Sequence, residues 1–92
     1  MTNRFERARD LRQLRFMLSA IRAFESGASS RERVLQDLDE LFLMLSVDNS
    51  KWRGQFVDTR KSFEKNPHKA IKRLGQLLEG EINRREREAA DG

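Results

Sequence analysis

The sequence contains no cysteine and no tyrosine, and it has a single proline and a single histidine. Without cysteine, disulfide bonds and thiolate metal sites are excluded, and a reducing compartment, the cytoplasm, is the expected location. With one proline and only five glycines, a sheet of many short strands joined by turns is not expected. These absences favour helices over strands.

Long apolar runs are also missing. The most apolar early stretch, residues 16–24, is interrupted by Arg22 and is too short to cross a membrane. The N-terminal residues show no apolar segment after a basic start, which a secretory signal would have. We therefore expect an unprocessed, soluble protein that does not associate with a membrane.

The residue types that catalysis needs are scarce. His68, the one histidine, follows Pro67, and we expect it to be a solvated residue in the first turn of a helix. Asp37, Asp39 and Glu40 are too crowded on one helix to converge on a metal ion. No glycine-rich phosphate loop is present, so we expect no cofactor. Paired carboxylates remain open as acid and base, but they would need a cleft for which a 92-residue chain has little room. We expect a binding protein and not an enzyme.

Apolar residues recur at spacings of three and four in four segments, which predicts amphipathic helices. The segments cover about 4–26 and about 30–46, a third region around Trp52, and a fourth from about 67. The predicted core consists of Leu11, Leu14, Met17, Leu18, Ile21, Phe24, Val34, Leu35, Leu38, Leu41, Phe42, Leu45, Trp52, Phe56, Phe63, Ile71, Leu74, Leu78 and Ile82. The prediction is an all-α fold, an antiparallel bundle of about four helices. It forms one domain over 1–92, with a charged C-terminal end that frays from about residue 83.

Several residues predict where the helices begin and end. Gly27 is placed for a left-handed cap at the end of the first helix. Ser29 and Glu32 have the spacing of a capping box at the start of the second. The Asn66-Pro67 pair predicts a break before the fourth, because proline has no N–H to donate and restricts the residue before it.

The formal net charge of +4 favours a nucleic-acid partner at first sight. Its distribution points elsewhere. Residues 28–48 carry five acidic and two basic side chains, and the segments on both sides of them are basic. Because the middle of the chain is acidic, we do not expect the protein to present the single positively charged surface that is typical of a nucleic-acid binder.

The outward side of the second helix is the predicted partner-binding surface. Asp37, Glu40 and Met44 project together there, with Asp39 and Leu43 on the other margin. Carboxylates around exposed apolar residues suit a basic partner, because charge steers the encounter and the apolar contact anchors it.

The first helix carries a second stripe, which consists of Phe5, Arg9, Arg12, Phe16, Ala20 and Ala23. One interpretation is a basic and aromatic surface for RNA or an acidic partner. The other is a helix that packs on two sides, with arginines that extend over the core. We favour the second interpretation and expect both phenylalanines to pack against the fourth helix or the N-terminal arm.

Three stretches resemble a known family. These are Ile21–Gly27 (IRAFESG), Val34–Leu41 (VLQDLDEL), and the later order of Trp52, Phe56 and Phe63-Glu64. Over about residues 21–64 the chain resembles small helical immunity proteins of bacterial contact-dependent growth-inhibition and polymorphic toxin systems. The resemblance implies a cytoplasmic inhibitor that binds one cognate toxin, often a nuclease with a basic cleft.

Two other interpretations compete with an immunity role. One is a small basic protein that associates with nucleic acid through the first and fourth helices. The other is a homo-oligomer formed through surplus apolar residues, among them Leu43, Val57 and Leu77. The sequence does not indicate an oligomeric state.

Overall fold

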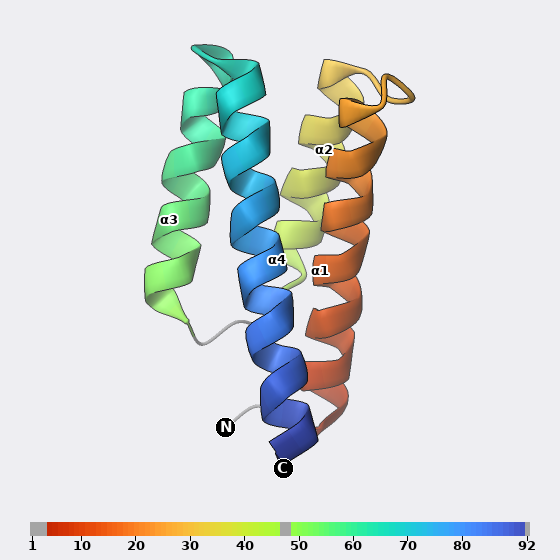
Figure 1. The fold of residues 1–92 in the computed structure, drawn as a ribbon, viewed down its shortest axis with the longest axis vertical. Helices are drawn as coiled ribbons and strands as arrows, with labels where there is room; N and C mark the ends of the chain where they lie inside the picture. The colour runs from red at the N-terminus through yellow and green to blue at the C-terminus, as the bar shows by residue number, and fades with distance from the viewer. Residues whose placement is uncertain (1–3, 47–48, 92) are drawn as a thin grey trace. The chain divides into compact units, whose positions relative to one another are not determined.

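The computed structural model describes residues 4–46 and 49–91. Within them lie four α-helices and no strand: α1 (Arg4–Glu25), α2 (Arg31–Leu43), α3 (Ser50–Lys61) and α4 (Pro67–Asp91) (Figure 1). A single turn of 3-10 helix, η1 (Ser62–Glu64), follows α3. The predicted all-α fold with four helices is confirmed. The chain divides into two compact units, unit 1 (residues 1–47) and unit 2 (residues 48–92).

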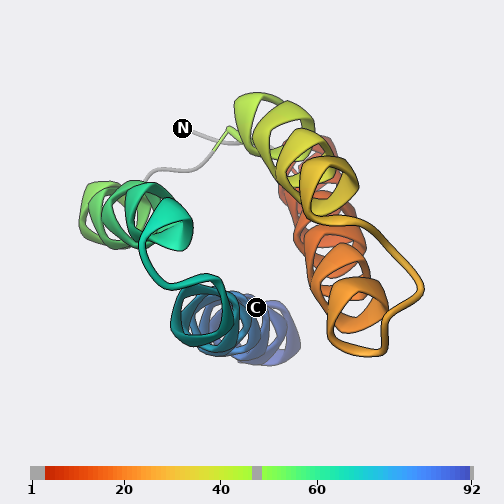
Figure 2. The same cartoon turned by 90° about the horizontal axis from the view of Figure 1, so that it is seen from above.

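Unit 1 is an antiparallel hairpin of α1 and α2 (Figures 1 and 2). Its buried side chains repeat every three or four residues along each helix, which gives each helix one apolar side. They include Leu14, Met17, Ile21, Val34 and Leu38, all fully buried. Every one of these five was predicted to lie in the core.

Gly27 ends α1 in the left-handed conformation, with φ of +83°. The amide of Ala28 donates to the carbonyl of Ala23 at 2.8 Å, and the amide of Gly27 donates to Phe24 at 3.1 Å. This pair of bonds is a Schellman motif, which satisfies carbonyls that the helix end would leave open. The predicted glycine cap is therefore confirmed.

The predicted capping box at the start of α2 is wrong by one residue. Ser30, and not Ser29, is the N-cap: its backbone is extended and its hydroxyl accepts the amide of Arg33 at 3.1 Å. The residue three positions after this cap is Arg33, so Glu32 cannot return a bond in a capping box. The Ser29 hydroxyl instead lies 3.5 Å from the carbonyl of Ser30.

Unit 2 is a second antiparallel hairpin, in which α3 and η1 pack on α4 (Figures 1 and 2). Trp52 and Phe56 contact each other, with ring centroids 5.3 Å apart. Phe63, which was predicted to lie in the core, is buried in η1, after the end of α3. The remaining core side chains come from α4 and include Ala70, Ile71, Leu74, Leu77, Leu78 and Ile82.

Asparagine side chains begin both helices of unit 2. The Asn49 side-chain oxygen accepts the amide of Trp52 at 3.2 Å, and that of Asn66 accepts the amide of Lys69 at 3.2 Å. An asparagine cap satisfies an amide that has no partner within the helix. Because Asn66 caps α4 and Pro67 is its first residue, the predicted break at this pair is confirmed.

Candidate protein-interaction surface

The exposed apolar side chains of the described residues are concentrated in unit 1. Among the residues whose burial is described, the exposed large hydrophobic ones all lie there: Phe5 (86% exposed), Phe16 (54%), Leu43 (82%) and Met44 (52%). In unit 2, by contrast, Leu77 is buried, so the expectation that it forms surplus apolar surface is wrong, and Val57 is half-buried. Leu43 and Met44 are adjacent in the chain, and exposed apolar side chains that lie together are typical of a surface for further contacts.

The predicted residues on α2 come together on the surface of that helix. Leu43 is the last residue of α2, and Asp39 and Glu40 precede it by four and three positions. Residues at these spacings are neighbours on a helix surface, and all three are exposed. Asp37 is half-buried, and Met44 caps the helix. We call Asp37, Asp39, Glu40, Leu43 and Met44 the acidic–apolar surface.

The carboxylates of this surface differ in their partners. Asp37 forms an ion pair with Arg33 one turn earlier, with 3.2 Å between Oδ2 and Nε. The Glu40 Oε1 accepts from the neutral amide of Gln36 at 3.2 Å, and no cation of the described residues forms an ion pair with Glu40. Much of the Asp37 charge is therefore offset within α2, whereas Glu40 presents its charge beside Leu43.

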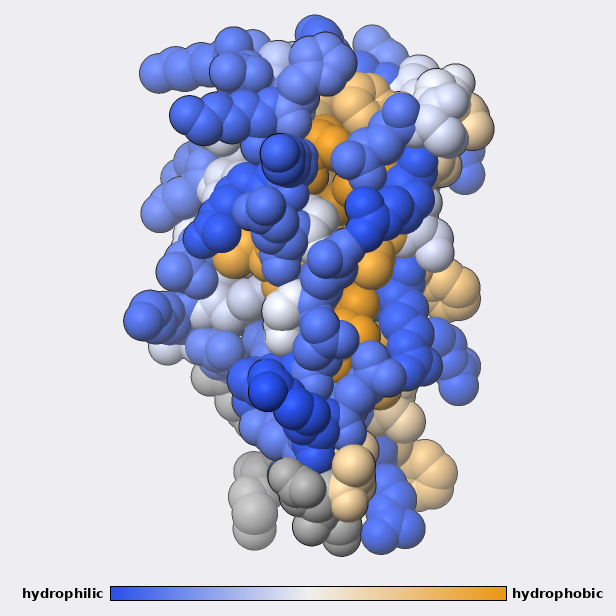
Figure 3. Space-filling view, viewed as in Figure 1, coloured by the Kyte–Doolittle hydropathy of each residue, from blue (hydrophilic) through white to orange (hydrophobic). Residues whose placement is uncertain are grey.

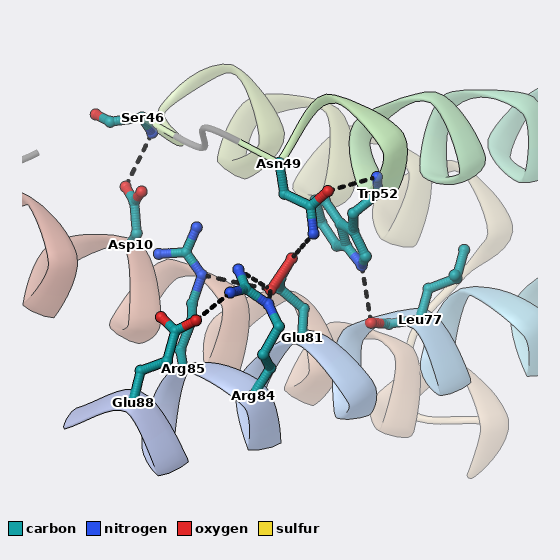
Figure 4. Close-up of polar contacts among 9 residues, drawn as sticks. All are labelled: Asp10, Ser46, Asn49, Trp52, Leu77, Glu81, Arg84, Arg85 and Glu88. Carbon is teal, nitrogen blue, oxygen red and sulfur yellow. Dashed lines mark hydrogen bonds and ion pairs between the residues drawn. The ribbon is translucent and has the colours of Figure 1, made fainter. Parts of the chain in front are cut away.

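Polar side chains of α1 hold the chain where it leaves α2. The Asp10 Oδ1 accepts the amide of Ser46 at 2.9 Å (Figure 4). The Arg9 Nη2 donates to the Ser46 hydroxyl at 2.9 Å. The Gln13 side-chain amide lies 3.9 Å from the Met44 sulfur. These bonds explain why α2 ends at Leu43 and not near residue 46 as predicted, because the Ser46 amide bonds to a carboxylate of α1.

The basic–aromatic stripe of α1 (Phe5, Arg9, Arg12, Phe16, Ala20 and Ala23) lies on the surface. The expectation that its phenylalanines pack inside is wrong. The α1 helix buries Leu14 and Met17 on one side, and Phe5 and Phe16 project from the opposite side. Figure 3 shows apolar atoms at the surface along the margin that α1 occupies in Figure 1.

The stripe and the acidic–apolar surface adjoin each other. Arg9 belongs to the stripe and bonds to Ser46, two residues after Met44. One end of the hairpin therefore presents apolar side chains together with guanidinium groups from α1 and carboxylates from α2.

Two buried carboxylates were missed at the sequence level. Asp10 is 1% exposed and Glu81 is 3% exposed. Both follow the spacing of the core: Asp10 lies four residues before Leu14, and Glu81 lies three after Leu78. Their position at the same helical spacing as the buried apolar residues could have predicted that these two carboxylates are buried.

Glu81 joins α4 to the start of α3. Its Oε1 pairs with Arg84 at 2.6 Å and lies 3.9 Å from the Arg85 Nε. Its Oε2 accepts from the Asn49 side-chain amide at 3.2 Å (Figure 4). The hydrogen bond to Glu81 raises the pKa of Arg84 above its ordinary value, against the opposing effect of burial, and the nearby charges of Glu81 and Glu88 raise it further.

The indole of Trp52 makes a second polar link between the same two helices. Its Nε1 donates to the backbone carbonyl of Leu77 at 2.9 Å, in a buried position (Figure 4). A buried indole N–H left without an acceptor would be destabilising. The Glu81 and Trp52 bonds both serve the packing of unit 2.

No group of His, Cys, Asp and Glu side chains within residues 4–46 and 49–91 is arranged to hold a metal ion. In the same part of the chain, no helix combines the length and apolar character needed to cross a membrane. The chain matches no protein-family model, no curated protein and no solved structure.

Proposed function

We propose that the protein acts by binding another protein through the end of the α1–α2 hairpin, with Leu43 at the centre of the contact. The observation that carries this proposal is that unit 1 exposes four large apolar side chains at once. Apolar groups in the middle of an interface provide most of its affinity, and charged groups around them provide orientation and speed of encounter.

The charges at this site favour a protein over a nucleic acid. Arg9 and Arg12 would attract a phosphate backbone, but the adjoining α2 presents Asp39 and Glu40. The carboxylates of α2 would therefore repel a phosphate backbone beside the arginines of α1 that attract it. A protein surface that carries both signs can be complementary to such a site.

Inhibition of a bacterial toxin is the specific role that we propose. Its support is the resemblance of residues 21–64 to immunity proteins, together with the carboxylates beside Leu43. A toxin that cuts nucleic acid has a basic cleft, and carboxylates can occupy the positions of phosphates there. In this role Asp39 and Glu40 steer the complex and Leu43 anchors it.

The test uses the protein encoded next to this chain's gene, co-expressed with the full-length chain. Leu43→Ala should weaken the complex about 5- to 30-fold, mainly through faster dissociation, as expected for a central anchor. The pair Asp39→Lys and Glu40→Lys should slow association about tenfold or more at low salt, with a smaller effect at high salt.

The matched control is Glu32→Lys. Glu32 is exposed, lies on the same helix, and is eight residues from Glu40, about 12 Å along the axis. This variant should keep the association rate within about twofold of the rate for the unchanged chain. If Leu43→Ala and the double charge reversal both leave binding and toxin neutralisation unchanged, with helical content preserved by circular dichroism, this surface is not the binding site.

A further inference from the structure

The first half of α4, in unit 2, carries a surface that the proposed function does not use. Residues 65–78 contain Lys65, Lys69, Lys72 and Arg73 and no aspartate or glutamate. All four side chains are exposed. No other stretch of this length in the chain combines so many cations with no carboxylate.

Three of these cations share one side of the helix. Lys69, Lys72 and Arg73 are three and four positions apart, which places them side by side on the surface of α4. The apolar residues of the same turns, Ile71 and Leu74, are buried on the other side. Lys65 caps η1 just before α4 begins. We call Lys65, Lys69, Lys72 and Arg73 the α4 cation face.

Several other cations of the described residues are neutralised by carboxylates one helical turn away. Arg22 pairs with Glu25, and Arg84 pairs with Glu88. No cation of the α4 cation face forms an ion pair with any described residue. Their positive charge is therefore directed entirely at solvent, or at a partner.

We propose that the α4 cation face binds the phosphate backbone of duplex nucleic acid. Lys69 and Arg73 are about 6 Å apart along the helix axis, at about 1.5 Å per residue. Duplex DNA carries one negative charge per about 1.7 Å of its length. Because each strand carries one phosphate per about 3.4 Å of the axis, the span from Lys69 to Arg73 covers about two phosphates of one strand, and Lys65 and Lys72 extend the face to others. Contacts to phosphates need only cations and no apolar anchor.

The other anionic partners fit this face less well. A helix that lies on a membrane inserts its apolar side, but Ile71, Leu74 and Leu78 on α4 are buried. An acidic protein would need an apolar anchor, and the described part of unit 2 exposes no large apolar side chain.

The composition of the face also determines the mode of binding. No exposed phenylalanine or tryptophan is present on it to stack on bases. A single strand would therefore gain no stacking contact here, which favours a duplex, and contacts to phosphates alone carry no information about base sequence. Carboxylates return in the second half of α4, from Glu79 onward, which restricts the footprint to the end of unit 2 where η1 joins α3 to α4. Figure 3 shows hydrophilic side chains projecting at this end, at the upper left.

Fluorescence anisotropy tests this proposal with the full chain and labelled 25-base-pair DNA duplexes of two unrelated sequences. Both duplexes should bind equally at low salt. The logarithm of affinity should fall with the logarithm of salt with a slope of about −3 to −4, or about −0.9 for each phosphate that is neutralised. The triple variant Lys69→Glu, Lys72→Glu, Arg73→Glu should lose at least about 100-fold in affinity. The triple variant Lys69→Gln, Lys72→Gln, Arg73→Gln should lose less, with a shallower slope.

A control variant separates this face from the overall charge. Arg4→Glu, Arg7→Glu and Arg12→Glu change three exposed arginines of α1 and give the same net charge. This control should keep its affinity for DNA within about threefold. If it abolishes binding while the α4 variant does not, α1 is the nucleic-acid surface and the proposal is wrong.

Two further results would also overturn it. One is no change in anisotropy with either duplex at 20 mM salt. The other is binding to vesicles that contain anionic lipid but not to DNA. The α4 variant should still neutralise the toxin, and Leu43→Ala should still bind DNA, so this proposal and the proposed function succeed or fail separately.

Discussion

The two units have the same architecture, an antiparallel helical hairpin, but they treat apolar and charged side chains in opposite ways. Unit 1 leaves Phe5, Phe16 and Leu43 exposed among charges of both signs. Unit 2 buries its aromatic residues, pairs its buried carboxylate, and leaves unpaired cations on one side of α4. The same hairpin can therefore present an apolar recognition surface or a purely electrostatic one, and the residues on the outer sides of the helices determine which.

Phenylalanine truncation gives the largest expected difference between the units. Phe63→Ala removes a side chain that is 1% exposed, and it should reduce the free energy of unfolding by about 3–5 kcal/mol, because it leaves a cavity. The matched control, Phe5→Ala in unit 1, removes a side chain that is 86% exposed, so it should change stability by less than about 0.5 kcal/mol. Urea denaturation followed by circular dichroism measures both. A comparable loss in both variants would mean that Phe5 is buried in solution and that the comparison is wrong.

The two ends of the Glu81 network give the next largest difference. Glu81→Gln removes a charge whose side chain is 1% exposed and which meets Arg84 and Arg85. It should be destabilising by about 1.5–3 kcal/mol, the range for hydrogen bonds to charged groups. Glu88→Gln, with a side chain 61% exposed in a pair with the same Arg84, should cost less than about 0.5 kcal/mol.

The contribution of Arg84 to stability should depend on pH in one direction only, with a loss at high pH. The folded-state pKa of Arg84 is raised, chiefly by its hydrogen bond to Glu81. Its contribution to stability is therefore fully present below its unfolded-state pKa and is lost as the pH rises through the folded-state value. Both values lie in strongly alkaline solution. The loss of stability caused by Arg84→Gln, measured by thermal unfolding, should thus be the same at pH 6 and at pH 9, and a loss that shrinks as the pH rises between them would contradict the assigned pair.

Most of the fold is predictable because the apolar spacing of each helix is local information. The spacing of three and four residues is enough to predict the burial of Leu14, Ile21, Leu74 and Leu78. Boundaries are less predictable when neighbouring residues have equal capping ability, as with Ser29 and Ser30. The end of α2 was mispredicted because the Asp10–Ser46 bond joins residues 36 positions apart, which no local pattern reveals.

The candidate surfaces were predictable only in part. The five residues of the acidic–apolar surface follow from helical spacing, and the structure shows four of them exposed and Asp37 half-buried. The pairing of Asp37 with Arg33 depends on side-chain conformation and was not anticipated. The exposure of Phe5 and Phe16 was mispredicted, because spacing reveals a shared side of a helix but not whether another element covers it.

The smallest expected difference comes from two glycines in different conformations. Gly27, in the connection of unit 1, has φ of +83°. Gly27→Ala should be destabilising by about 1 kcal/mol, because a Cβ atom disfavours the left-handed region. Gly54 lies within α3 of unit 2, and a Cβ built on it meets nothing within 4 Å. Gly54→Ala should therefore be stabilising by about 0.5–1 kcal/mol, since alanine loses less conformational entropy in a helix. Thermal unfolding should shift in opposite directions for the two variants, and a shift in the same direction would show that one of the two backbone conformations is not the one in solution.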